Sequence, residues 1–326
     1  MPQISIIIPV YNGALLISRC LDSIFNQAGD FKLDVIVIDD GSTDDTVDIL
    51  NRYPHPLKLL QQKNQGPAAA RNKGIDVANG EYLAFLDADD YWKPSFLKQT
   101  VAFLENHKDA IAVSVGQKHI TTSSGKSGTI VPNILASNPE KIKQPILLDN
   151  FFEFWATHFH VCTGSILMET QVVKNTGGQR TDLRITEDLE FWAYLATFGR
   201  MGFIPQILFV SDGGIVTKKT GWLKKNKQRW ASAPTVEEWE VRIIRAIPDK
   251  DVKQYQIARG RIAKNLAYSM IMSGRTKLAR ETIQKYGHSF PNDRISKLLQ
   301  IGNKHSLLWI PIISLFQIRE ITRIVR

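Results

Sequence analysis

Three carboxylates lie within four residues at the end of a predicted strand. Asp87, Asp89 and Asp90 follow the apolar run at 82–86. Like charges this close repel one another, and at the carboxyl end of a buried strand they are only partly hydrated. A divalent cation removes that conflict, and carboxylate oxygens suit Mg²⁺ or Mn²⁺. If the extended geometry continues past the strand, Asp87 and Asp89 point to one side. An acidic turn before a helix opened by Lys93-Pro94 explains the same residues, so both interpretations stay open.

A second acidic group follows Thr186, in the run Thr-Glu-Asp-Leu-Glu-Phe-Trp at 186–192. Taken alone, it is typical of a helix start. Thr186 would be the cap, and Glu187 and Asp188 would complement the helix dipole in the first turn.

The elements that position these residues alternate along the first hundred residues. β-Branched runs at 4–10 and 33–38 predict strands covered on both faces, and a shorter strand is expected at 57–61. Helical spacing of apolar residues follows the first strand. Ser42 or Thr43 is expected to cap a helix after the second strand, and Gly66-Pro67 to open the next.

Strands and helices that alternate with short connections predict an α/β fold with a doubly wound, mainly parallel sheet. Ligands of such sheets bind outside the carboxyl ends of the strands. The polar groups at Tyr11-Asn12, Asp39-Asp40 and 87–90 follow three of these ends. We therefore expect them to meet in one crevice.

The middle of the chain has a weaker pattern. Extended segments are expected at 110–115, 161–168 and 203–210. His158, His160 and Cys162 alternate and would share one face of a strand. They lack a fourth ligand and a usual zinc spacing, so packing or contact with an acceptor is favoured.

The composition is that of an ordinary soluble globular protein, with 43% hydrophobic and 22% charged residues among 326. Two cysteines, Cys20 and Cys162, do not indicate a disulfide framework, which favours a reducing, cytoplasmic setting. The first residues, Met-Pro-Gln-Ile-Ser, have no basic region or cleavage site, so no signal peptide is expected.

Charge divides the chain in two. Residues 1–214 carry a net charge of −6, whereas residues 215–326 hold 23 Lys and Arg against 8 Asp and Glu, a net of +15. We place a domain boundary near 215, between a domain at 1–215 and a basic helical region at 216–326. Such a region suits a polyanion, either nucleic acid or an anionic membrane. The apolar block 307–316 contains Pro311 and is too short to span a bilayer. It lies in a membrane interface or packs on the main domain, and its flanking charges favour the interface.

Two nucleotide-binding patterns are excluded. No Gly-x-Gly-x-x-Gly follows the first strand, which argues against a dinucleotide site. Gly125-Lys126-Ser127 resembles the end of a phosphate loop, but Ile120 occupies the place of the required glycine.

Several segments together resemble the family 2 glycosyltransferases, inverting enzymes with the GT-A fold. They appear in the family's order between residues 4 and 192, and they are 5–13, 37–44, 64–72, 80–90 and Glu187-Asp188. The region after 215 carries none of these motifs. The resemblance implies a GT-A sheet in the first part of the chain, and the amphipathic, basic pattern beyond residue 221 predicts the C-terminal helical region.

The resemblance also implies roles for single residues. Asp89 would ligate Mg²⁺ or Mn²⁺, and Asp87 would help or touch the ribose. Asp40 would accept the uracil N3–H, with Pro9 and Tyr11 around the base.

For the chemical step, the resemblance implies that Asp188 is the base that takes the acceptor's hydroxyl proton. Arg71 is expected to contact the anionic nucleotide, with a surface salt bridge as the alternative.

The activity implied is transfer of a hexosyl or N-acetylhexosaminyl group, with inversion, from a nucleotide diphosphate sugar such as a UDP-sugar. The acceptor would be a hydroxyl of a glycan or lipid-linked molecule in polysaccharide biosynthesis. We expect a cytoplasmic protein that lies at the inner face of the membrane; an oligomer is left open.

The sequence departs from the family at two places. Gly177-Gly178-Gln179 stands where Gly-Gly-Phe is frequent, which puts local packing in doubt. The His that the family frequently has past the catalytic domain is not evident near Asp212-Gly213-Gly214, so the remaining metal ligands are unassigned.

Two other classes of protein share some of these sequence features. A nucleotidyltransferase would have a similar sheet and a similar metal site. The Gly-rich, Arg-containing activation loop of that class is missing after the first strand of this sequence. A nucleic-acid-binding protein fits the pI of 9.4. It would need interleaved aromatics or a known module in the basic region, so no nucleic-acid partner is expected.

Overall fold

The computed structural model describes residues 1–121, 128–130, 144–158, 161–212 and 222–325. Within these, side chains are described for 1–120, 144–156, 161–212 and 226–320. The expected domain boundary near 215 falls outside the described residues.

The strands are β1 (Gln3–Val10), β2 (Lys32–Asp39), β3 (Lys58–Gln61), β4 (Tyr82–Phe85), β5 (Tyr91–Trp92), β6 (Ala110–Thr121), β7 (Gly128–Ile130), β8 (Ile146–Leu147), β9 (Ile166–Glu169) and β10 (Arg200–Ser211). The helices up to residue 195 are α1 (Ile17–Phe25), α2 (Thr46–Asn51), α3 (Pro67–Val77), α4 (Phe96–Asn106), α6 (Phe151–His158), α7 (Thr170–Asn175) and α8 (Glu187–Leu195). Those of the C-terminal part are α9 (Trp222–Ala231), α10 (Val236–Glu240), α11 (Ile243–Ala246), α12 (Val252–Met272), α13 (Thr276–Tyr286), α14 (Arg294–Lys304) and α15 (Trp309–Val325). Short 3₁₀ turns η1 (Asp249–Asp251), η2 (Gly287–Ser289) and η3 (Ser306–Leu308) join some of these helices.

One mixed, mostly parallel sheet organises the first two thirds of the chain, in the order β3-β2-β1-β4-β9-β6-β10-β5. The four strands β3, β2, β1 and β4 are parallel, as are β6 and β10. Strand β9 runs antiparallel between β4 and β6. The predicted α/β class with a mainly parallel, doubly wound sheet is therefore confirmed. The antiparallel insertion was not predicted.

Alternation along the strands separates two hydrophobic cores. In β1, Ile4, Ile6 and Ile8 belong to the core formed with α1 and α4, whereas Ile7 belongs to the core on the opposite face. That second core includes residues of α3 and α8 and continues into the C-terminal helices, through Trp239 and others. Burial on both faces explains why β1 and β2 are nearly continuous apolar runs.

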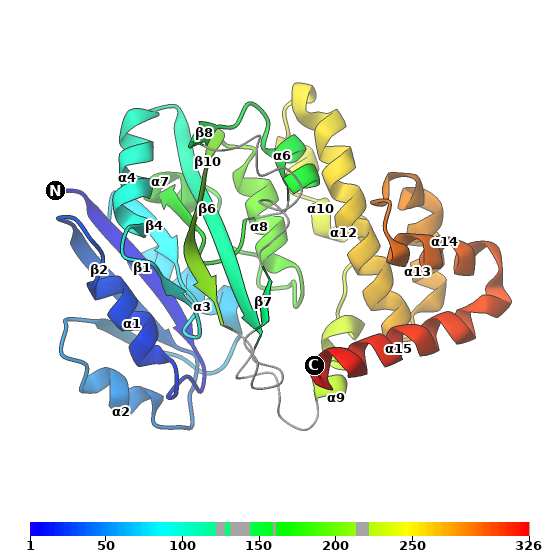
Figure 1. The fold of residues 1–326 in the computed structure, drawn as a ribbon, viewed down its shortest axis with the longest axis horizontal. Helices are drawn as coiled ribbons and strands as arrows, with labels where there is room; N and C mark the ends of the chain where they lie inside the picture. Colours follow the sequence, from blue (N-terminus) through cyan, green and yellow to red (C-terminus); the bar gives the residue numbers. More distant parts are fainter. Residues whose placement is uncertain (122–127, 131–143, 159–160, 213–221, 326) are drawn as a thin grey trace.

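The C-terminal helices pack beside the sheet domain (Figure 1). Helix α12 contacts α6 on one side and α13 on the other, and α15 runs along the edge of this helical group. These helices agree with the expected helical region. Among the described helices, none combines the length and the apolar character that a bilayer crossing requires.

Some local predictions were wrong. Helix α2 begins at Thr46 with Asp45 before it, and neither Ser42 nor Thr43 caps it. The Ser42 hydroxyl instead accepts the Asn12 N–H at 2.9 Å, because two loops meet there. His158 ends helix α6, so it shares no strand with Cys162. Residues 159–160 lie outside the described part.

Candidate active site

The carboxyl ends of β1, β2 and β4 bring the predicted polar groups together. The Asp40 N–H donates to the Val10 carbonyl at 2.8 Å, which joins the loops after β1 and β2. The loop after β1 also lies close to the loop after β4, because a Cβ built on Gly13 would be 3.6 Å from the Cβ of Ala88. The predicted polar groups thus meet where parallel strands end side by side.

The acidic segment after β4 turns sharply. The Asp90 N–H donates to the Asp87 carbonyl at 2.9 Å, so the extended geometry assumed for these residues does not continue past Leu86. Burial, and then the Asp87 carboxylate, raises the pKa of Asp89. Burial with the Asp87 and Asp89 carboxylates raises the pKa of Asp90 to about 8. The turn therefore gathers carboxylates whose charges are not balanced within the segment.

Arg71 on α3 contacts this turn directly. Its side chain is almost fully buried, and Nη2 lies 2.6 Å from Asp87 Oδ1. Burial alone would lower the pKa of Arg71, but Asp87, with smaller contributions from Asp188 and Glu187, raises it. Arg71 thus forms the salt bridge that the alternative expected, but its own side chain is only 5% exposed, whereas that of Asp87 is 33% exposed.

Asp188 is in the first turn of α8, as expected of a helix start. The preceding Thr186 is not an ordinary cap, because its φ is +61° and its side chain makes no capping hydrogen bond. A left-handed conformation is uncommon for a β-branched residue and is held only where surrounding contacts determine it. Burial, which outweighs its backbone hydrogen bond and the Arg71 charge, raises the pKa of the half-buried Asp188.

The residues predicted to hold the nucleotide base lie at the carboxyl ends of β1 and β2. The buried Asp40 carboxylate accepts three donors, namely Gln62 Nε2 at 2.8 Å, Gln65 N at 2.9 Å and Gly66 N at 2.8 Å. It thereby fixes the loop that precedes α3. Pro9 is buried in β1, whereas the Tyr11 ring is 53% exposed and open to a ligand.

Gln179 completes the surroundings of Arg71 and was not predicted. Its side chain is buried, its Oε1 accepts from Arg71 Nη1 at 3.1 Å, and its backbone exchanges two hydrogen bonds of 2.8 Å with the Asn72 side chain. Where the family frequently has Phe, this chain places a second partner for the guanidinium. The sequence shows that Gln179 replaces the Phe of Gly-Gly-Phe, but it does not show that Gln179 contacts Arg71.

Arg19 and Asp212 form a further pair that was not predicted as part of the site. Arg19 makes a 2.5 Å ion pair with Asp212, and its Nη2 donates to the Asp89 carbonyl at 2.6 Å. The Asp212 N–H donates to Asp90 at 3.0 Å. The end of β10 is thus tied to the acidic turn.

The donor set fits a hard divalent cation. Asp89 is half-buried beside other carboxylates, and Asp212 Oδ1 is buried without a partner among the described side chains. Within the described residues, no group of three or more His, Cys, Asp or Glu side chains surrounds a single point. Such a set agrees with Mg²⁺ or Mn²⁺ that takes one or two protein carboxylates and completes its shell with water and phosphate oxygens.

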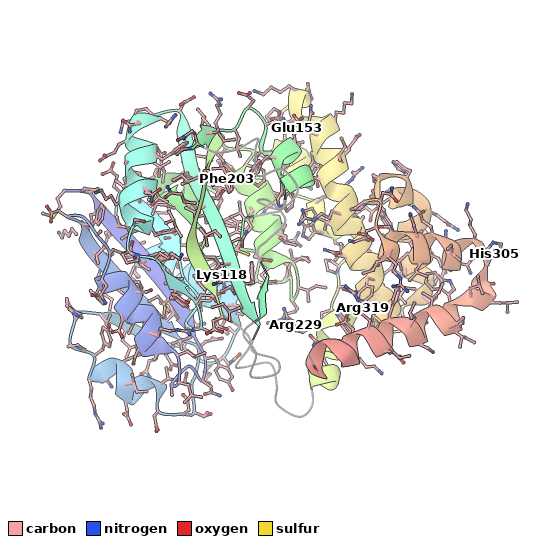
Figure 2. The ribbon with its side chains drawn as sticks, in the orientation of Figure 1. Lys118, Glu153, Phe203, Arg229, His305 and Arg319 are labelled. Atoms are coloured by element: carbon pink, nitrogen blue, oxygen red, sulfur yellow. The ribbon has the colours of Figure 1, made fainter. Side chains whose placement is uncertain are left out.

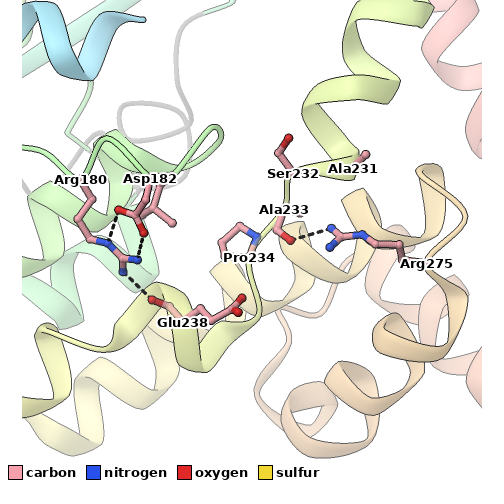
Figure 3. Close-up of a pocket in the computed structure, with 9 residues that line it drawn as sticks. Arg180, Asp182, Ala231, Ser232, Ala233, Pro234, Glu238 and Arg275 are labelled. Carbon is pink, nitrogen blue, oxygen red and sulfur yellow. Dashed lines mark hydrogen bonds and ion pairs between the residues drawn. The ribbon is translucent and has the colours of Figure 1, made fainter. Parts of the chain in front are cut away.

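A cavity of about 300 Å³ lies beside the site, between the 180–183 loop and the C-terminal helices (Figure 3). On one side, Arg180 pairs with Asp182 and donates to the Glu238 carbonyl at 2.5 Å. On the other side, Arg275 donates to the Ala233 carbonyl at 2.7 Å. None of the predicted catalytic or nucleotide-binding residues lines this cavity.

Comparison with known proteins places the chain in a family. The family model described as glycosyl transferase family 2 matches residues 5–170. A poly(ribitol-phosphate) beta-glucosyltransferase of Bacillus spizizenii is 45% identical over 95 residues, which are 27% of this chain and 15% of that protein. The poly(ribitol-phosphate) beta-N-acetylglucosaminyltransferase TarS of Staphylococcus aureus is 36% identical over 123 residues, 35% of this chain and 21% of that one.

Solved structures share the fold over nearly the whole chain. TarS 1-349 of S. aureus in complex with UDP-GlcNAc has a TM-score of 0.65 at 17% identity, covering 97% of this chain and 91% of that one. Mannosyltransferase PcManGT of Pyrobaculum calidifontis, in complex with GDP-Man and Mn²⁺, has a TM-score of 0.59 at 20% identity, covering 96% and 86%. At these identities the likeness concerns the fold.

The matched segments span less than half the length of the curated relatives named. The family model nevertheless covers half of this chain, from β1 to the start of α7, and so includes the loops at the carboxyl ends of β1, β2 and β4. The predicted relationship is confirmed. The chain belongs to glycosyl transferase family 2.

Proposed function

We propose that the protein transfers a hexosyl or N-acetylhexosaminyl group from a nucleotide diphosphate sugar to a hydroxyl of a glycan or lipid-linked acceptor, with inversion. The observation that carries the proposal is the position of the buried Arg71 guanidinium, which pairs with Asp87 of the acidic turn and donates to Gln179 in the loop before α8, and whose pKa the Asp188 charge helps to raise. The carboxylates proposed to bind the donor and to activate the acceptor therefore both act on one guanidinium. Membership of the family favours this activity over nucleotidyl transfer and over nucleic-acid binding.

The donor's nucleotide is assigned to the crevice at the ends of β1 and β2. Tyr11 is exposed there, and Pro9 closes the end of the strand behind it. Asp40 already accepts three hydrogen bonds, so it supports the loop after β3 and has a remaining lone-pair direction for a base N–H. The structure of the related TarS contains UDP-GlcNAc, which supports a UDP-sugar as donor.

Asp89, assisted by Asp87 and Asp212, would hold Mg²⁺ or Mn²⁺. When bound, the cation supplies the positive charge that makes the nucleoside diphosphate a good leaving group. Arg71 and Arg19 hold the turn through Asp87 and the Asp89 carbonyl, which keeps these carboxylates close together in spite of their repulsion.

Asp188 is assigned as the base. Its carboxylate takes the proton of the acceptor hydroxyl as that oxygen bonds to C1 of the sugar. The bond from C1 to the diphosphate oxygen breaks, and its electron pair leaves with the nucleoside diphosphate. Attack from the side opposite the leaving group inverts the anomeric centre.

Binding of UDP tests the donor and metal assignments. We expect the melting temperature to rise with UDP plus Mn²⁺ and to rise much less with UDP in EDTA. Asp89→Asn should remove the Mn²⁺-dependent part of the shift and leave the melting temperature without ligand near that of the wild type. Asp109→Asn, which removes an exposed carboxylate of the same domain, is the matched control. Equal UDP binding in EDTA and in Mn²⁺ would contradict the assignment.

We also propose that the helical region docks on an anionic membrane surface, where a lipid-linked acceptor would be met. Helix α15 buries Trp309, Ile312 and Phe316 on its inner side. Its outer side and the preceding turn leave Leu307 89%, Ile310 77% and Ile318 57% exposed. On the adjoining α14, exposed basic residues accompany an exposed Ile301, and these are Arg294, Lys297 and Lys304.

This apolar and basic surface, which we call the α14–α15 face, has the character of an interfacial segment. His305 lies at the outer corner where the chain passes from α14 to α15 (Figure 2). The charge of +15 over residues 215–326 adds the attraction that anionic lipid requires.

A further inference from the structure

A residue of the C-terminal helical region, Arg242, contacts two side chains of helix α8. Arg242, in the turn between α10 and α11, makes a bidentate ion pair with Glu190, with Nε–Oε1 and Nη2–Oε2 distances both of 2.6 Å. Glu190 is fully buried. The guanidinium also lies over the Tyr194 ring, 4.3 Å from its centroid. Glu190 and Tyr194 are four residues apart and so lie on one face of α8.

The same guanidinium holds the loop that leads to α8. Arg242 Nη1 donates to the carbonyls of Thr176 at 3.2 Å and Gly178 at 3.0 Å. Gly177 and Gly178 have φ values of +71° and +81°, so this loop adopts a conformation that its neighbours must hold. One side chain thus joins the loop of Gln179 to the helix of Asp188.

A second contact fixes the start of α8. The fully buried Trp239 donates its indole N–H to the Thr186 carbonyl at 3.2 Å. Thr186 is the residue with a left-handed backbone. A capping box between Thr235 and Glu238 holds the helix that carries Trp239. The unusual backbone conformation immediately before Glu187 is therefore supported from the C-terminal helices.

Asp188 lies on the opposite face of α8 from the side chains that Arg242 contacts. At 100° per residue, Asp188 is about 200° around the helix from Glu190. Its carboxylate is close enough to Arg71 and Asp87 for each to influence its charge state. Burial raises the pKa of Glu190, which the Arg242 charge partly opposes. A buried carboxylate of this kind requires its partner, so losing Arg242 would disturb the first turn of α8, which also carries Asp188.

We infer that Arg242 is a positioning residue for catalysis, which holds α8 and its preceding loop so that the Asp188 carboxylate meets the acceptor hydroxyl. The inference rests on the proposed role of Asp188. It makes the C-terminal helices part of the active-site architecture, although Arg242 lies beyond the segment that the family model matches.

The test is a double-mutant cycle with Arg242→Lys and Asp188→Asn. Arg242→Lys keeps the charge but loses the bidentate geometry, because an ammonium group cannot reproduce the planar fork. We expect kcat to fall by about 10- to 100-fold, the order of loss that a small misplacement of a catalytic group produces. The affinity for UDP with Mn²⁺ should stay within about twofold.

In the Asp188→Asn background, Arg242→Lys should reduce the residual rate little further, since coupled residues are not additive. A positioning role is contradicted if Arg242→Lys lowers the rate equally in both backgrounds, or if kcat is unchanged in the wild-type background. If Asp188→Asn itself is fully active, the proposed base is wrong, and this outcome is distinct from a failure of Arg242 alone.

A control separates positioning from stability. Lys264→Met breaks the 2.8 Å Lys264–Asp293 ion pair, which lies wholly within the C-terminal helices. Both variants should lower the melting temperature, but only Arg242→Lys should lower kcat. Equal losses of kcat would reduce Arg242 to a structural residue and overturn the inference.

Discussion

At the scale of single residues, the site is organised by arginines that bind carboxylates. Arg71 contacts Asp87, and Arg19 contacts Asp212. A buried charge left without its partner is costly, so each of these pairs constrains the loops that supply it. The Arg71 guanidinium binds Asp87 and influences the charge state of Asp188, the two carboxylates proposed to bind the donor and to take the proton.

Replacing Asp188 by Asn tests the proposed base. The amide keeps the shape of the side chain but cannot accept the proton, so kcat should fall by about 10²–10⁴-fold. UDP affinity in the presence of Mn²⁺ should barely change, because the acidic turn is intact. Steady-state kinetics and UDP titration measure the two quantities. Sugar transfer at nearly the wild-type rate would leave Asp188 as no more than a helix-start residue.

At the scale of elements, close approach of backbone segments decides where glycine is needed. In α12, a Cβ on Gly260 would lie 1.9 Å from the Ser289 carbonyl oxygen of η2. Helix propensity alone favours Ala over Gly there by about 1 kcal/mol. The contact between α12 and η2 opposes that preference, because a backbone carbonyl cannot move aside as a flexible side chain can.

Gly260→Ala should therefore lower the free energy of unfolding by about 1–3 kcal/mol, the usual cost of overpacking. Urea denaturation measures it. Gly287→Ala is the control, since its Cβ would meet only Ile283 Cγ2 at 3.4 Å, and it should change stability by less than about 0.5 kcal/mol. Stabilisation by Gly260→Ala would mean that α12 and η2 are farther apart than described.

At the scale of the whole molecule, the distribution of charge along the chain and the extent of the hydrophobic core suggest different domain boundaries. The change in charge near 215 suggests two parts, yet one hydrophobic core includes Phe85 and Trp192 of the sheet domain together with Trp239 and Tyr255 of the C-terminal helices. Deleting residues 297–326 would remove the buried Leu299 and Phe316 and uncover residues such as Tyr268, which packs against Phe316, so point variants on exposed residues probe the membrane role more cleanly.

Co-sedimentation with liposomes tests the α14–α15 face. The protein should bind vesicles that contain anionic lipid at low salt and dissociate as salt rises, because each Lys or Arg near the surface contributes about 1 kcal/mol. Leu307→Glu combined with Ile310→Glu should weaken binding at least tenfold. Ile257→Glu, at a 57% exposed position of α12, should have a smaller effect. If the wild type ignores anionic vesicles at low salt, the face has another role.

The sequence by itself determined the parallel sheet and the family. Buried strands have continuous apolar runs, and their polar ends meet because parallel strands finish at one edge. Asp40 and the 87–90 segment were predicted for this reason, and the structure brings both to that edge. The roles of Asp40, Arg71, Asp87, Asp89 and Asp188 in catalysis and binding remain predictions.

Tertiary structure decided which side chains are partners. Arg71 contacts Gln179, which is 108 residues away in the sequence, and Arg242 contacts Glu190, which is 52 residues away. Such spacings have no period, so no local pattern in the chain signals them. The turn at Asp87–Asp90 and the left-handed Thr186 likewise depend on surrounding contacts. Local sequence specifies elements through short-range sterics and burial, whereas the pairing of buried charges depends on which elements the fold packs together.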